Sequence, residues 1–145
     1  MRGPSSNGTT KVGALVFASL TLVSCGDPTE GASGEPPVIV EAIDDSEISR
    51  LQLSDSAATR LDIQLGTVEQ AETGLVVPSA AIIIDPTGTY WVYTSPEPLV
   101  FIRHELEEVY EASQQAFFES GPPEGTPVVV IGVPELYGAE FGIGK

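Results

Sequence analysis

Short runs of β-branched and aromatic residues recur about every ten residues after residue 37, and turn residues separate them. The runs are VIVEAI (38–43), TVEQA (67–71), GLVVPSAAIII (74–84), TYWVYT (89–94), LVFIRHELEEVYE (99–111), QQAFFES (114–120) and PVVVIGV (127–133). The DPTG segment (85–88) has Pro second and Gly fourth, which is typical of a β-turn. This spacing predicts a mainly β fold, either a small barrel, a roll or a sandwich.

Two segments depart from the strand pattern and predict short helices. Ser54 is a favourable N-cap with Asp55 in the following turn, and Ala57, Ala58 and Leu61 have helical spacing. We therefore expect a helix from about Asp55 to Leu61. The closing PELYGAEFGIGK segment (134–145) predicts about one further helical turn.

The first 24 residues have the order of a secretory signal. Two basic residues, Arg2 and Lys11, precede an apolar run over 12–23, which is too short to span a bilayer as a mature helix. Ser24 then stands before Cys25, the only cysteine. Residues 22–25, LVSC, resemble the lipobox of bacterial lipoproteins, which implies cleavage before Cys25 and acylation of its thiol. The alternative is a cysteine that merely ends an ordinary signal peptide.

These signals predict three parts of the chain. Residues 1–24 are a lipoprotein signal peptide, residues 25–37 are the lipidated cysteine with a flexible Gly- and Pro-rich linker, and residues 38–145 are a single β-rich domain. Beyond Cys25 the chain has four basic and 21 acidic residues, a balance of 4 − 21 = −17. Such a charge disfavours nucleic acid and anionic headgroups, so we expect lipid rather than charge to hold the protein at the membrane.

The sequence holds few residues suited to catalysis or to transition-metal binding. His104 is the single histidine, and in strand register it shares a face with Ile102 and Leu106, which favours a packed histidine over a catalytic one. No nucleophile elbow or phosphate loop occurs. We therefore expect no enzyme activity, no metal and no cofactor.

The acidic clusters predict a solvated surface rather than a site. Asp44, Asp45 and Glu47 lack the spacing of a calcium loop. A second group comprises Glu105, Glu107 and Glu111, with Arg103 among them on one strand face.

The aromatic run at 90–93 alternates between two faces of its strand. Tyr90 and Val92 lie on one face, and Trp91 and Tyr93 lie on the other. Either both faces belong to the core, or one of them contacts a partner protein. The side chains predicted to contact a partner are Tyr90, Trp91, Tyr93, Leu136 and Tyr137.

The ordered segments RLDIQLGTVEQ (60–70), LVVPSAAIIIDPTGTYWVYT (75–94), LVFIRHELE (99–107), GPPEGTPVVVIG (121–132) and PELYGAEFG (134–142) resemble parts of a known family. They are similar to the early and C-terminal segments of HlyD-type periplasmic adaptor proteins, or membrane fusion proteins, of resistance-nodulation-division efflux pumps. The resemblance implies their membrane-proximal domain, a small β-roll. The lipoyl domain, helical hairpin and β-barrel domain of full adaptors have no counterpart between residues 70 and 74.

Together the lipobox and the adaptor resemblance imply a non-catalytic accessory or adaptor module for a membrane transporter of the efflux type. We expect it at the extracytoplasmic face of the cell membrane, anchored through Cys25 and docked on an inner-membrane transporter. The alternative is a stand-alone envelope lipoprotein with a structural or ligand-binding role.

Overall fold

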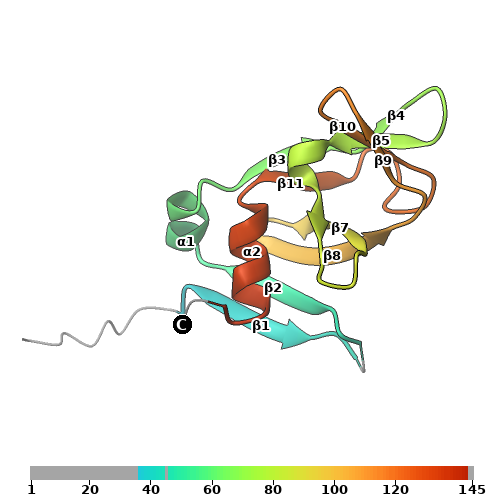
Figure 1. The fold of residues 1–145 in the computed structure, drawn as a ribbon. Helices are drawn as coiled ribbons and strands as arrows, with labels where there is room; N and C mark the ends of the chain where they lie inside the picture. The colour runs from blue at the N-terminus through green and yellow to red at the C-terminus, as the bar shows by residue number, and fades with distance from the viewer. Residues whose placement is uncertain (1–35, 45, 144–145) are drawn as a thin grey trace, which may run out of the picture. The chain divides into compact units, whose positions relative to one another are not determined.

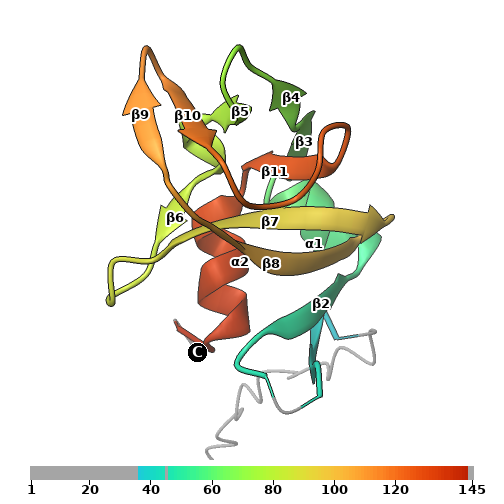
Figure 2. The same ribbon diagram turned by 90° about the vertical axis from the view of Figure 1, so that its right-hand side faces the viewer.

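Antiparallel strands are the main secondary structure of residues 36–44 and 46–143, which are the residues described by the computed structural model of this protein. Seven strands form the larger sheet: β1 (Val38–Ala42), β2 (Ser49–Leu53), β3 (Gln64–Thr67), β6 (Ile83–Ile84), β7 (Tyr90–Glu97), β8 (Val100–Leu106) and β11 (Pro127–Ile131). Their order is β1-β2-β8-β7-β11-β3 (Figure 1), and β6 pairs with the first part of β7 (Figure 2). The predicted mainly β fold is confirmed.

A smaller sheet lies against the larger one. It consists of β4 (Glu69–Gln70), β5 (Leu75–Pro78), β9 (Tyr110–Ala112) and β10 (Gln115–Phe118), in the order β4-β5-β10-β9. Figure 2 shows these four strands together on one side of β7, with β2 on the other side of β8.

Two helices cover the opposite face of the larger sheet, and a single 3-10 turn, η1 (Ser79–Ala81), follows β5. Helix α1 (Asp55–Arg60) confirms the predicted short helix, and the Ser54 hydroxyl caps it by accepting the Ala57 N–H at 3.3 Å. Helix α2 (Val133–Glu140) runs from the end of β11 toward β1 and β2 (Figure 1). Neither α1 nor α2, the helices of the described residues, is long and apolar enough to cross a membrane.

Helix α2 is longer than the single turn predicted from the sequence. Gly132 precedes it with φ +93°, a left-handed conformation that glycine adopts readily, and Pro134 stands in its first turn. Val133 and Leu136 are then buried against the sheet, and this packing holds a helix that local propensity alone did not indicate.

The strand predicted from the TYWVYT run (89–94) is also longer than that run, because it continues into the PEP segment (96–98). Strand β7 continues to Glu97, and its pairing with β8 shifts register between Thr94 and Glu97. Proline is tolerated at such an irregularity because one ladder hydrogen bond is already missing there. Leu99, with φ +63°, then makes the tight return into β8.

Side chains on the two faces of the larger sheet form two separate cores. The helix-side core contains Leu51, Leu53, Ala57, Tyr93, Phe101, Val129, Val133 and Leu136. The core between the sheets contains Val68, Val77, Ala81, Val92, Leu106, Ala116, Phe118 and Val128. The larger sheet is therefore the middle of three layers, so that successive residues of β7 and β8 face the helices and the smaller sheet in turn.

Candidate functional site

Strand register brings together the charged and aromatic residues of the helix side. Tyr93 of β7 lies directly opposite Arg103 of β8, and Trp91 lies opposite Glu105. Because alternate residues share a face, Trp91, Tyr93 and Arg103 all point toward α2. His104 is one position further along β8 and therefore lies on the other face. The prediction of a packed histidine is wrong, because His104 is exposed, although desolvation by its neighbours lowers its pKa below the ordinary value.

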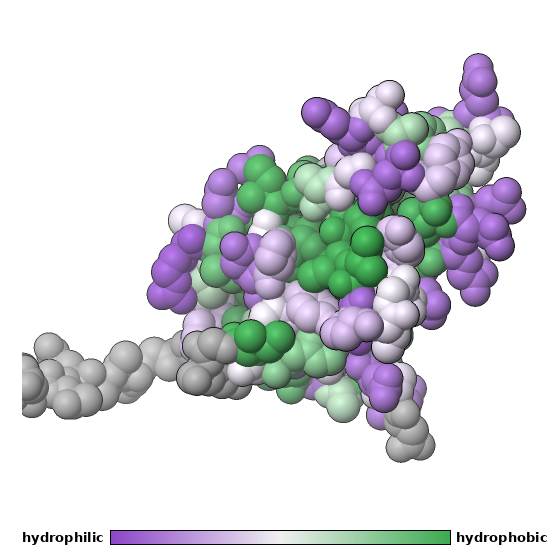
Figure 3. Space-filling view, in the orientation of Figure 1, coloured by the Kyte–Doolittle hydropathy of each residue, from purple (hydrophilic) through white to green (hydrophobic). Residues whose placement is uncertain are grey.

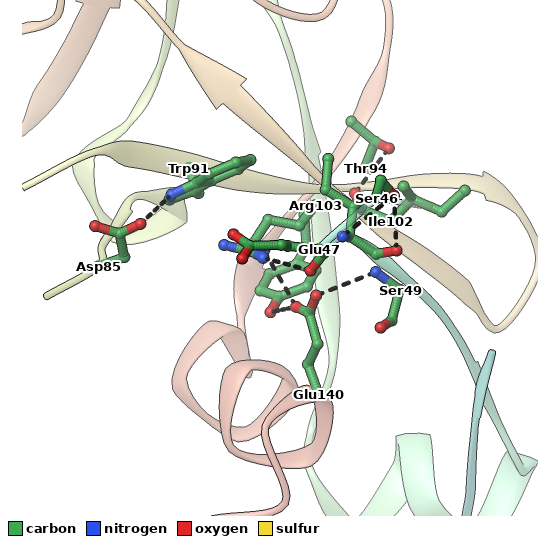
Figure 4. A network of polar contacts seen from close by, with 11 residues as sticks. Ser46, Glu47, Ser49, Asp85, Trp91, Thr94, Ile102, Arg103 and Glu140 are labelled. Carbon is green, nitrogen blue, oxygen red and sulfur yellow. Dashed lines mark hydrogen bonds and ion pairs between the residues drawn. The ribbon is translucent and has the colours of Figure 1, made fainter. Parts of the chain in front are cut away.

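Glu140, in the last turn of α2, completes this group with a buried ion pair. Its Oε2 lies 3.3 Å from Arg103 Nε, and the two side chains are only 2 % and 5 % exposed. The same oxygen accepts the Tyr93 hydroxyl at 2.5 Å, and Oε1 accepts the Ser49 N–H at 3.3 Å (Figure 4). A buried charge requires such compensation, so this one carboxylate ties α2 to β2, β7 and β8.

The Tyr93 phenol stays protonated within this network. Burial raises the pKa of Tyr93 far above its ordinary value, and the hydrogen bond to Glu140 raises that pKa further. The phenol is therefore a hydrogen-bond donor that holds Glu140, and not a proton source at neutral pH.

Trp91 is held from the other side by the β6–β7 turn. Its indole N–H donates to Asp85 Oδ2 at 3.0 Å, while Asp85 Oδ1 accepts the Thr87 hydroxyl at 2.6 Å and the N–H groups of Thr87 and Thr89 at 2.8 and 3.1 Å. These donors, the Thr87 hydroxyl foremost, lower the pKa of Asp85 to about 2 against a smaller opposing effect of burial. Asp85 is therefore ionised at neutral pH.

Aromatic rings surround the Arg103 guanidinium. Its central carbon lies 4.0 Å from the centroid of the Trp91 ring and 5.1 Å from that of Phe141, distances typical of cation–π contacts. The Tyr137 and Phe141 rings are 4.6 Å apart. Arg103 Nη2 also donates to the backbone carbonyl of Glu47 at 3.2 Å.

These groups line a surface hollow of about 590 Å³. We call it the arginine hollow and define it by Glu47, Asp85, Trp91, Arg103, Tyr137 and Phe141. Figure 4 shows Trp91, Arg103, Glu47 and Glu140 gathered beside α2. The hollow combines a cation, carboxylates and aromatic faces, and it is suited to binding a ligand or a side chain by charge and stacking.

The hollow holds no arrangement of a nucleophile with a general base. In the part of the chain that the structure describes, no group of three His, Cys, Asp or Glu side chains is placed to hold a metal ion.

Two of the five predicted partner contacts are wrong. Tyr93 and Leu136 are 0 % exposed, because both point into the helix-side core, and neither has surface for a partner. Tyr90, Trp91 and Tyr137 are half-buried, and only Trp91 and Tyr137 line the arginine hollow. Cys25 lies outside the described residues.

The sequence pattern did not reveal the roles of Arg103, Glu140 and Asp85. Arg103 was expected on a solvated face with acidic residues, and this was wrong because its side chain is 5 % exposed. The signal was present: Arg103 alternates with Phe101, which belongs to the core. Phe141, 47 % exposed, also lines the hollow.

Comparison of the chain with protein-family models, with curated proteins and with solved structures finds no match.

Apolar side chains reach the surface elsewhere as well. Figure 3 shows hydrophobic surface between hydrophilic side chains on one face. Outside the hollow, the large apolar residues that are most exposed are Leu65, Ile84 and Tyr110, at 51 %, 50 % and 53 %. These residues provide matched control positions for tests of the hollow.

Proposed function

We propose that this protein is a lipid-anchored, non-catalytic accessory module that docks on a membrane transporter at the extracytoplasmic face of the cell membrane. The anchor is Cys25 and the docking site is the arginine hollow. The observation that carries the proposal is the group of half-buried or exposed aromatic side chains, Trp91, Tyr137 and Phe141, around one fixed arginine. Aromatic residues and arginine are enriched where protein partners bind most tightly.

The resemblance to adaptor proteins supports the same role. It covers about residues 61–142, and the mainly β fold is the kind of fold that it implied. A lipid anchor would confine the domain near membrane proteins and so raise the effective concentration of a membrane partner.

Crosslinking in cells, followed by mass spectrometry of the copurified proteins, tests this function. We expect one polytopic transporter to be recovered with the unchanged chain and its recovery to fall in Phe141→Ala. Leu65→Ala is the matched control, because Leu65 is 51 % exposed and Phe141 is 47 % exposed, but only Phe141 lines the hollow. Equal loss in both variants, or no transporter at all, would contradict docking through the hollow.

Membrane fractionation tests the anchor separately. We expect Cys25→Ala to move from the membrane fraction to the soluble fraction, because the thiol is the proposed site of acylation. Retention of that variant on membranes would show that the lipobox reading is wrong.

A stand-alone lipoprotein that binds a ligand is the second candidate. The volume of the hollow, about 590 Å³, is within the range of small-molecule sites. Recovery of only abundant envelope proteins, unchanged in Phe141→Ala, would favour this candidate.

A further inference from the structure

The charges around the arginine hollow do not balance to zero. Arg103 is paired with Glu140 at 3.3 Å, so these two buried charges offset each other. The other ionisable carboxylates that line the hollow belong to Glu47 and Asp85. Among the described residues that line the hollow, Arg103 is the single cation, so a bound group meets a net negative surface.

The Asp85 carboxylate is held in place by hydrogen bonds, whereas the Glu47 carboxylate is exposed at the hollow. Asp85 is fixed by four donors from Thr87, Thr89 and Trp91, and those donors keep it ionised at neutral pH. Glu47 is held through its backbone, whose carbonyl accepts from Arg103 at 3.2 Å, while its side chain is exposed. The hollow therefore contains one fixed negative charge, that of Asp85, and a second, exposed carboxylate on Glu47.

The aromatic rings already hold one cation. Arg103 stacks on Trp91 and lies near Phe141, so these ring faces are arranged for a guanidinium. Phe141 keeps 47 % of its surface exposed, which leaves room for a second positively charged group from outside. Carboxylates beside aromatic faces recognise the same chemistry, a cationic side chain.

Resting on the proposed function, we infer that the group which the partner protein inserts into the arginine hollow is a Lys or Arg side chain. The charge of the whole chain, −15, attracts a basic surface toward the domain. An acidic side chain could pair only with Arg103, which is already paired with the Glu140 carboxylate. It would also be repelled by the carboxylates of Glu47 and Asp85.

A titration of the full chain in detergent micelles tests this inference without the partner. Trp91 is the only tryptophan, so its fluorescence reports directly on the hollow. The probes are two capped Gly/Ser peptides that differ at one residue, Arg in one and Glu in the other. We expect a saturable change in emission with the Arg peptide, weakened by added salt, and none with the Glu peptide. Tighter binding of the Glu peptide, or no change with either, would overturn the inference.

A variant that neutralises one carboxylate of the hollow tests whether the Arg peptide binds at this place. We expect Glu47→Gln to bind the Arg peptide about two- to five-fold more weakly, the range that follows from losing one exposed ion pair. Glu124→Gln is the control, since it removes the same charge from an exposed position that does not line the hollow. Equal weakening of peptide binding in both variants would show that binding depends on net charge alone, and it would overturn the inference that the hollow is the binding site.

The two proposals fail in distinguishable ways. If crosslinking recovers a transporter but the Arg peptide does not bind, the inference fails while the proposed function stands. If the Arg peptide binds and no transporter is recovered, the cation site stands and the accessory role fails.

Discussion

Two arginines of this chain form ion pairs of similar length in different surroundings, and they allow a direct test of what burial contributes. Arg103 lies 3.3 Å from Glu140, with side chains 5 % and 2 % exposed. Arg50 lies 3.5 Å from Glu41 and 3.4 Å from Glu97, and these three side chains are 33 %, 58 % and 67 % exposed. We predict that Arg103→Met is strongly destabilising and that Arg50→Met is not.

The magnitudes follow from the exposure of the partner that each change leaves behind. Without Arg103, the buried Glu140 side chain loses its cation, and breaking such a pair costs about 3–5 kcal/mol of the free energy of unfolding. Exposed pairs contribute about 0–1 kcal/mol each. Methionine retains the apolar stem of arginine, and both variants lose one positive charge, so neither packing nor net charge separates them.

Urea denaturation of both variants at pH 7, monitored by far-UV circular dichroism, measures the difference. We expect the free energy of unfolding to fall by about 3 kcal/mol or more in Arg103→Met and by about 1 kcal/mol or less per lost contact in Arg50→Met. Equal losses would refute the reasoning, because they would mean that the Arg103–Glu140 pair is solvated.

Further predictions concern backbone conformation and pH. Gly132→Ala places a Cβ 2.2 Å from the Ile63 Cδ1 atom at φ +93°, whereas the Cβ of Gly125→Ala, at φ +82°, meets nothing within 4 Å. Both variants lose about 1–2 kcal/mol of stability because alanine disfavours the left-handed conformation, and only Gly132→Ala adds a steric cost of about 1–3 kcal/mol. Thermal unfolding of both variants would measure this difference. A smaller loss in Gly132→Ala than in Gly125→Ala would contradict this. The folded-state pKa of Asp85 is about 2, below its model-compound value of 3.8, so its ionised form stabilises the fold above about pH 4, and this contribution is lost as the pH falls toward 2. The stability difference between the unchanged chain and Asp85→Asn should therefore narrow between pH 5 and pH 2 in urea titrations, and a difference independent of pH would show that ionisation of Asp85 is not responsible.

The sequence predicted those elements of secondary structure that depend on neighbouring residues alone. The Ser54 cap and its following alanines gave α1, and the DPTG turn appears as a Gly88 N–H to Asp85 carbonyl hydrogen bond of 2.9 Å. Helix α2 was underestimated because its length depends on the packing of Val133 and Leu136, which is a tertiary effect.

The site was harder to predict because it depends on residues far apart in the chain. Alternation along β7 and β8 places Trp91 and Arg103 on one face, but their cross-strand neighbours follow only from the register. No pattern within the sequence indicated that Glu140 would meet Arg103, since that contact requires the particular placement of α2 on the sheet.

The position of Glu140 also has a consequence for the order of folding. Its carboxylate joins Ser49, 91 residues earlier, and Tyr93, 47 residues earlier. Contacts that close such long loops form late and slow the search for the native state. Until α2 docks, Arg103 lacks the Glu140 carboxylate with which it pairs, so β7 and β8 gain their full stability only when the last helix arrives. Docking of α2 should then be the slow, rate-limiting event in refolding.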